Sequence, residues 1–151
     1  MDETVNIFEQ GRIEGRIDLG GLAGSSETSA YVYDIAPGAA SCPYHYEFVE
    51  EWLLVVAGEA AVRTPEGERA VAAGQVVRFP AGAAGAHKIA NRGEAACRIM
   101  MFSAQRSPAV SVYPDSDKIA VWPSEDGADD GIFVRSTAVS WSYGEDGWNV
   151  A

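Results

Sequence analysis

The sequence of 151 residues predicts a single all-β domain, built as a barrel or a sandwich. Short runs of aromatic, β-branched and other apolar residues recur about every ten residues between turn signals, a spacing typical of such folds. Sixteen glycines and seven prolines are available for the turns. No stretch of useful length shows the apolar period of an amphipathic helix.

The expected barrel covers residues 30–104 and follows an N-terminal extension over residues 1–29. The extension is polar and glycine-rich, and its segment GGLAGSS (20–26) is typical of a loop. Within the barrel, the strands are expected at AYVYDIA (30–36), PYHYEF (43–48), EWLLVVAG (51–58), EAAVRT (59–64), RAVAAG (69–74), QVVRFP (75–80), HKIAN (87–91) and AACRIMMFSA (95–104). Turn signals such as PG, PEGE, AGAAGA and RGE separate these runs.

A C-terminal extension is expected over residues 105–151. AVSVY (109–113) and IFVRSTAV (132–139) are typical of strands, whereas SDKIAVWPSEDGADDG (116–131) is expected to be mostly loop. The extension keeps large apolar side chains that a fully solvated tail would not need: Val110, Val112, Trp122, Phe133, Trp141 and Trp148. We therefore expect it to pack on the barrel or to form a subunit contact, with a homodimer as the expected assembly.

The charge balance excludes several classes of partner. The chain has 22 acidic and 11 basic residues and a net charge of −11. Nucleic acids and anionic membranes both require basic surfaces, so neither is expected as a partner. The N-terminus MDETVNIFEQ does not resemble a signal peptide, and no apolar run approaches the ~20 residues of a membrane span. Cys42 and Cys97 are too few for a disulfide framework, so a cytoplasmic protein with reduced thiols is expected.

The stretch PYHYEFVEEW (43–52) carries a histidine and several carboxylates among apolar residues. His45 and Glu47 stand two positions apart in an expected strand, so their side chains should share a face. Glu51 begins the next strand after a short kink and can point to the same place, whereas its neighbour Glu50 should face solvent. Imidazole and carboxylate groups at this spacing suit a divalent first-row metal ion.

A second cluster lies between Gly74 and Asn91. Gly74 is followed by Pro80 and Gly82, then by His87 and Asn91, and the glycines provide turn geometry. His87 is expected near the start of its strand, from where it can add a nitrogen ligand from across the barrel.

These two blocks resemble the two motifs of the cupin superfamily. The first motif is Gly-x5-His-x-His-x3,4-Glu-x6-Gly, and here it runs from Gly38 through His45 to Gly58. The second is Gly-x5-Pro-x-Gly-x2-His-x3-Asn, with small spacing differences here that a turn can absorb. The resemblance covers roughly residues 30–103. The wider sequence pattern is similar to that of a bacterial subgroup of small single-domain cupins. The resemblance implies a double-stranded β-helix, a small jelly-roll-like barrel with a pocket between two sheets.

The resemblance also places metal ligands at His45, Glu51 and His87. The fourth family position is Glu47, where the pattern has a histidine. Glu47 can be a fourth ligand or a catalytic general base beside a set of three ligands. In a third reading, an internal ion pair with Arg78 or Lys88 replaces the metal. Carboxylate ligands favour Mn²⁺ or Fe²⁺, with Zn²⁺ and Ni²⁺ also open.

The expected function is that of a metal-binding cupin that acts on or binds a small organic molecule in its pocket. A metal-dependent enzyme of unknown substrate is the first reading, with oxygenase, isomerase and decarboxylase or lyase chemistry all represented among cupins. The alternatives are a non-catalytic small-molecule-binding module and a metal-free structural protein.

Overall fold

The computed structural model describes residues 4–9, 11, 13–123 and 126–145, and its fold confirms the all-β prediction. The strands are β1 (Arg16–Asp18), β2 (Thr28–Ile35), β3 (Tyr46–Glu47), β4 (Glu51–Ala57), β5 (Glu59–Thr64), β6 (Gly67–Ala72), β7 (Val76–Phe79), β8 (Lys88–Ala90), β9 (Cys97–Ala104), β10 (Ala109–Tyr113), β11 (Lys118–Trp122) and β12 (Gly131–Val134). The helical elements are α1 (Leu19–Leu22) and the 3-10 helices Ala83–Gly85, Pro114–Ser116 and Arg135–Thr137. Within these described residues, no helix is long and apolar enough to span a membrane.

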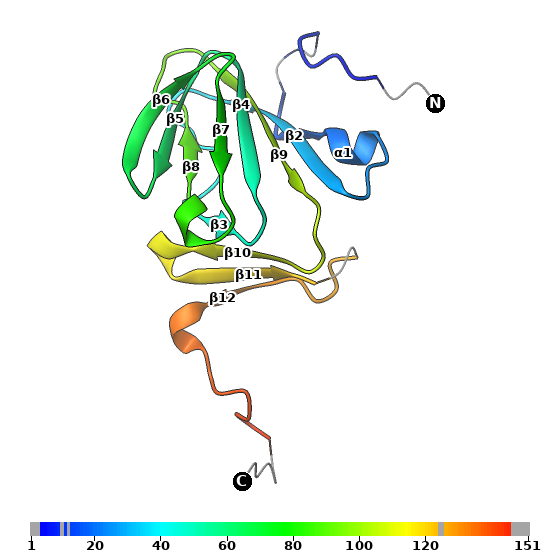
Figure 1. Ribbon diagram of the computed structural model, residues 1–151, viewed down its shortest axis with the longest axis vertical. Helices are drawn as coiled ribbons and strands as arrows, with labels where there is room; N and C mark the ends of the chain where they lie inside the picture. The colour runs from blue at the N-terminus through cyan, green and yellow to red at the C-terminus, as the bar shows by residue number, and fades with distance from the viewer. Residues whose placement is uncertain (1–3, 10, 12, 124–125, 146–151) are drawn as a thin grey trace.

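Two sheets enclose the core of the barrel. One has the strand order β1-β2-β9-β4-β7, and the other has the order β6-β5-β8 (Figure 1). Apolar side chains from both sheets meet between them, among them Leu53, Ile89 and Ile99, which are fully buried. The alternation of buried and less buried residues along β7 shows that one face of this strand points into the core.

A third sheet, with the order β12-β11-β10-β3, lies across one end of the barrel (Figure 1). β10 spans the expected residues 109–113 and pairs with β3, so Ser111 lies opposite Glu47. The expectation of a loop over 116–131 is wrong in its first half, because Lys118–Trp122 forms β11 and pairs along its whole length with β10. The strand expected over 132–139 is shorter, since β12 gives way to a 3-10 helix at Arg135.

The N-terminal region also contains structure that the sequence did not indicate. β1 pairs with β2 and extends the large sheet by one strand. The loop expected over 20–26 is wrong at its start, where α1 forms a short helix whose N-cap is the carboxylate of Asp18. Arg98 and Asp34 form a largely buried ion pair, with Nε–Oδ1 at 2.6 Å, and this pair ties the segment before β1 to the barrel. Arg98 donates to the carbonyl oxygens of Ile7 and Gly11.

Candidate metal centre

His45 and His87 are brought together by the backbone. They form an isolated antiparallel bridge in which each backbone N–H donates to the other residue's carbonyl oxygen, at 3.0 Å and 2.8 Å. Residues directly opposite in such a pair project their side chains from the same face. Their ring centroids accordingly lie 4.7 Å apart. His87 therefore reaches the site by direct backbone pairing with His45, and not from across the barrel as expected.

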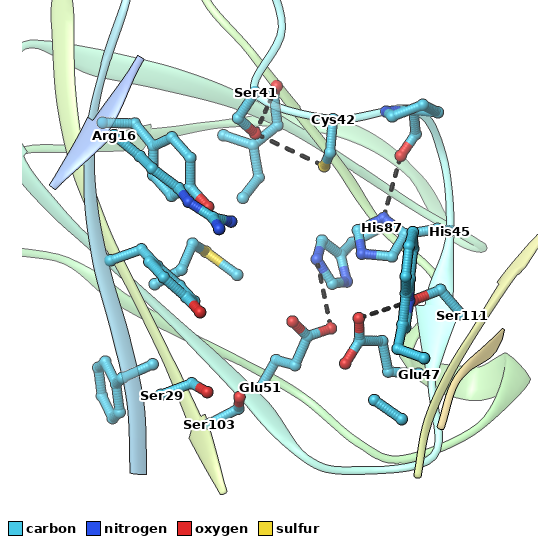
Figure 2. Close-up of a pocket in the computed structure, with 18 of the residues that line it drawn as sticks. Arg16, Ser29, Ser41, Cys42, His45, Glu47, Glu51, His87, Ser103 and Ser111 are labelled. Carbon is cyan, nitrogen blue, oxygen red and sulfur yellow. Dashed lines mark hydrogen bonds and ion pairs between the residues drawn. The ribbon is translucent and has the colours of Figure 1, made fainter. Parts of the chain in front are cut away.

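Glu51 completes a group of three ligand atoms. It is the first residue of β4, and its side chain is only 14% exposed. Its Oε2 lies 3.7 Å from Nε2 of His87. One ligand atom from each of His45, Glu51 and His87 lies within 4.8 Å of the other two (Figure 2). Two imidazoles and one carboxylate at this separation suit a divalent first-row ion.

Backbone carbonyl groups fix the tautomer of both imidazoles. Nδ1 of His87 lies 2.9 Å from the Gly85 oxygen, and Nδ1 of His45 lies 3.0 Å from the Pro43 oxygen. A carbonyl oxygen only accepts, so each Nδ1 carries the hydrogen and donates it. In the neutral ring, Nε2 then keeps its lone pair. Metal-binding histidines are oriented by this kind of second hydrogen bond.

His87 Nε2 provides a test of whether this site fits a metal ion. The His87 side chain is fully buried, and no hydrogen-bond partner for its Nε2 lies among the residues that the structure describes. Phe79 stacks on the ring with centroids 3.8 Å apart and an interplanar angle of 13°, which fixes the plane of the imidazole. A buried nitrogen lone pair without a partner is costly, and a metal ion would satisfy it. The donor set therefore fits a divalent cation.

The carboxylates of the site are not paired with a lysine or an arginine: among the described residues, neither Glu47 nor Glu51 forms an ion pair with such a side chain. The ion-pair reading is wrong about Arg78, which instead pairs with Glu50. Burial, followed by the nearby charge of Glu47, raises the pKa of Glu51 to about 7. A carboxylate whose pKa is raised in this way is stabilised by a proton or by a nearby cation.

The pKa values of the two imidazoles move in opposite directions. Burial lowers the pKa of His87 to about 4. Burial also acts to lower the pKa of His45, but interactions with Cys42 and the Glu51 carboxylate outweigh it and raise that pKa to about 9. Burial likewise opposes ionisation of the Cys42 thiol, yet its contact with His45 lowers the thiol pKa overall.

Glu47 lies beside the three-residue group and not within it. It lines the same pocket, and its Oε1 accepts a hydrogen bond of 2.9 Å from the Ser111 hydroxyl (Figure 2). Ser111 is 2% exposed and belongs to β10, so the C-terminal extension supplies the group that holds Glu47. No hydrogen bond to Oε2 of Glu47 comes from the described part of the chain.

The candidate ligand group of His45, Glu51 and His87 opens into a cavity of about 570 Å³. Sequence reasoning missed several residues that line it: Arg16, Ser29, Tyr31, Tyr33, Ser103, Ser111 and Tyr113. They lie on β1, β2, β9 and β10, outside both motifs. Tyr113 also stacks on His45, with ring centroids 5.8 Å apart. Alternation along 30–36 indicated that one face of β2 is inward, but only the pairing of strands shows which face meets the site.

Three other side chains around the site have defined contacts. Cys42 lines the cavity. Asn91 supports a turn, since its side chain donates to the carbonyl oxygens of Ile35 and Ala95 and accepts from Gly93 N–H. Tyr44 lies outside the cavity, where the Arg63 guanidinium packs 3.9 Å from its ring centroid.

Comparisons with known proteins agree with this fold. Residues 31–103 match the family model described as the cupin domain. No curated protein sequence matches the chain.

Solved structures share the fold. A protein from Silicibacter pomeroyi, described as a sugar phosphate isomerase from the cupin superfamily, is 24% identical, with a TM-score of 0.75 over 82% of this chain and 79% of that one. A protein from Acidithiobacillus ferrooxidans, described as a proposed sugar phosphate isomerase, is 21% identical, with a TM-score of 0.78 over 91% of this chain and 95% of that one. A polyketide cyclase from Streptomyces resistomycificus is 18% identical, with a TM-score of 0.59 over 72% of this chain and 84% of that one. These likenesses show the double-stranded β-helix fold.

Proposed function

Residues 31–103 are a cupin domain, and we propose that this domain is a divalent-metal-dependent enzyme acting on a small organic molecule held in its cavity. His45, Glu51 and His87 would hold the ion. With three protein ligands, the ion would still be able to bind substrate oxygens, and the cavity is large enough for a small metabolite.

One observation carries the proposal: the buried Nε2 of His87, which has no partner among the described residues. A core histidine with a purely structural role would normally satisfy both ring nitrogens. Here Nδ1 is satisfied by Gly85, and Nε2 is left close to a carboxylate and a second imidazole. The combination favours metal binding over a metal-free structural role.

Glu47 is the group best placed to move a proton. A bound divalent ion would polarise a substrate oxygen and so acidify neighbouring C–H or O–H groups. Ser111 donates to Oε1 of Glu47 and fixes the carboxylate at the cavity wall. With Oε2 free of hydrogen bonds from the described residues, Glu47 can accept a proton from a bound molecule and return it at another atom. This role favours isomerase or lyase chemistry over dioxygen chemistry.

Two of the similar structures are described as sugar phosphate isomerases, which agrees with the preference for isomerase or lyase chemistry but is not the basis for it. These descriptions concern those proteins, and at 24% and 21% identity the likeness extends to the fold alone. The proposal rests on the geometry of this chain.

Metal binding is the first test. We expect purified protein to contain a first-row metal by elemental analysis, and metal-free protein to bind Mn²⁺, Fe²⁺, Ni²⁺ or Zn²⁺ by calorimetry. His87→Ala and Glu51→Gln should each lower the affinity at least about tenfold, because each removes one of three ligands. Glu94→Gln, which changes an exposed carboxylate elsewhere, is the matched control. Full metal affinity in both ligand variants would sink the proposal.

Turnover is the second test. Metal-loaded protein that binds a metabolite without converting it over long incubation would favour the alternative function, a non-catalytic small-molecule-binding module. Conversion that is lost in His87→Ala and in Glu47→Gln would favour the enzyme.

A further inference from the structure

Arg16 brings a full positive charge to the wall of the cavity. It lies on β1, and Figure 2 shows its guanidinium directed into the cavity that Glu51 and His87 line from other sides. In the part of the chain that the structure describes, Arg16 forms no ion pair with a carboxylate. An unpaired arginine at the wall of a pocket is notable in a chain with 22 acidic and 11 basic residues.

Two tyrosines hold this guanidinium in place. Arg16 lies directly opposite Tyr33 in the β1–β2 pairing, so both side chains share the cavity face of the sheet. Its guanidinium carbon lies 4.3 Å from the centroid of the Tyr31 ring, a cation–π contact. These contacts orient the guanidinium without neutralising its charge, and the side chain remains accessible to solvent.

The same wall is lined with hydroxyl groups. Ser29, Tyr31 and Tyr33 alternate along β2 and all line the cavity. Ser29 pairs with Ser103 on β9, and Ser103 pairs with Glu51 on β4. A row of hydroxyls therefore runs across the sheet from β2 to the candidate metal ligand on β4. Such a surface suits a molecule with several oxygen atoms.

From these contacts we infer that the cavity binds a polyhydroxylated small molecule that carries a terminal oxyanion group, a phosphate or a carboxylate, and that Arg16 binds this group. The inference deepens the proposed function and rests on it, because the oxygens at the other end of the bound small molecule would contact the metal ion. An arginine fork matches both oxyanions and makes paired hydrogen bonds to either one.

The distance between β1, which carries Arg16, and β4, which carries Glu51, limits the size of the bound small molecule. β1 and β4 are three strands apart in the sheet, which is about 14 Å at the usual distance between neighbouring strands. The side chains of Arg16 and Glu51 extend into this gap, so a chain of several carbon atoms fits between the two ends. The carboxylates of Glu47 and Glu51 explain why the oxyanion is expected at the Arg16 end of the cavity.

Calorimetry with three probes of one carbon skeleton tests the inference. Manganese-loaded protein is titrated with glucose 6-phosphate, gluconate and glucose. We expect at least one of the two anions to bind ten times or more as tightly as glucose, and the tighter anion identifies the phosphate or the carboxylate. Arg16→Gln should reduce binding of that anion to the level of glucose, because it removes a charged hydrogen-bond donor. Arg16→Lys should retain part of the affinity, since it keeps the charge and loses the fork.

Controls separate this inference from the proposed function. Arg69→Gln changes an exposed arginine on β6, outside the cavity, and should bind the anion as the unchanged protein does. Manganese affinity is measured for every variant and should be the same in Arg16→Gln. Suppose the protein binds manganese, but Arg16→Gln binds the anion as tightly as the unchanged protein, or the unchanged protein prefers neither anion to glucose. Either outcome overturns the inference about Arg16 and leaves the proposed function standing. Arg16-dependent anion binding by protein that binds no metal supports the inference and rejects the proposed function.

Discussion

At the scale of single residues, the candidate metal site depends on which atom of each side chain is available as a ligand. Both histidines donate Nδ1–H to a backbone carbonyl two residues earlier in the chain, which leaves each Nε2 available as a ligand when the ring is neutral. Glu51 lies within 4.8 Å of both imidazoles, and Glu47 is held to one side by Ser111. The departure from the family pattern at Glu47 therefore leaves three candidate ligands together and adds a separate carboxylate to the cavity wall.

Substitutions at Glu47 test that separation. We expect Glu47→Gln to change metal affinity by less than about threefold and to lower turnover at least about a hundredfold, since a general base contributes roughly that much. Ser111→Ala should leave metal affinity unchanged and lower turnover, because Glu47 loses the hydrogen bond that holds its carboxylate at the cavity wall. Calorimetry and steady-state kinetics measure the two effects. A large loss of metal affinity in Glu47→Gln would instead make Glu47 a fourth ligand.

The metal affinity should depend on pH. The pKa of His45 is raised to about 9 and that of Glu51 to about 7, so near neutral pH both groups hold protons that a metal ion must displace. His87, with a pKa of about 4, is already neutral. We therefore expect the affinity to rise between pH 6 and pH 9, with protons released on binding. Calorimetry in buffers of different ionisation enthalpy measures that release, and a flat affinity over this range would contradict the assignment.

At the scale of elements, short backbone connections decide where the ligands lie. The 3-10 helix Ala83–Gly85 precedes His87, and the carbonyl oxygen of Gly85 orients its ring. Gly85 packs against the chain at Pro80, where an added Cβ would lie 1.7 Å from the Pro80 oxygen. No side chain fits there, so the turn between β7 and β8 requires glycine at this position.

Gly85→Ala tests this connection. The added methyl group must displace backbone and not a flexible side chain, and such overpacking costs about 1–3 kcal/mol of unfolding free energy. Because Gly85 also fixes the His87 ring, we expect metal affinity to fall in the same variant. Gly93→Ala, in an exposed turn, is the control, since its Cβ would approach only the Asn91 side chain at 3.3 Å. Urea unfolding measures the loss of stability, and calorimetry measures the loss of metal affinity. Unchanged metal affinity in Gly85→Ala would show that the conformation of this turn does not determine metal binding.

At the scale of the whole molecule, the C-terminal extension has two parts. β10 and β11 lie across the end of the barrel and bring Ser111 and Tyr113 to the cavity. The 3-10 helix at Arg135 and residues 138–145 after it extend away from the barrel (Figure 1). β12 is the edge strand of its sheet, and large apolar side chains are exposed along this part of the chain: Ile132, Phe133, Val134, Val139, Trp141 and Tyr143.

We expect this exposed apolar segment to bind a second copy of the chain, because a free strand edge and contiguous apolar side chains together suit self-association. The double substitution Phe133→Ser and Trp141→Ser should convert a dimer to a monomer in light scattering coupled to size-exclusion chromatography. Phe8→Ser, which changes an exposed aromatic residue at the other end of the chain, is the control. A monomeric unchanged protein, or a variant that remains dimeric, would refute this assignment.

The sequence by itself determined the all-β class, most strands of the barrel and the three residues that form the ligand group. It could do so because strand alternation and motif spacing are local properties, and the matched family covers residues 31–103. Only the tertiary structure decided what surrounds those ligands. β1, β11, the pairing of Ser111 with Glu47 and the approach of Arg16 to the cavity all depend on contacts between residues distant in sequence. Side chains two residues apart share a face, but the face that meets the site is set by strand pairing, which no local pattern contains.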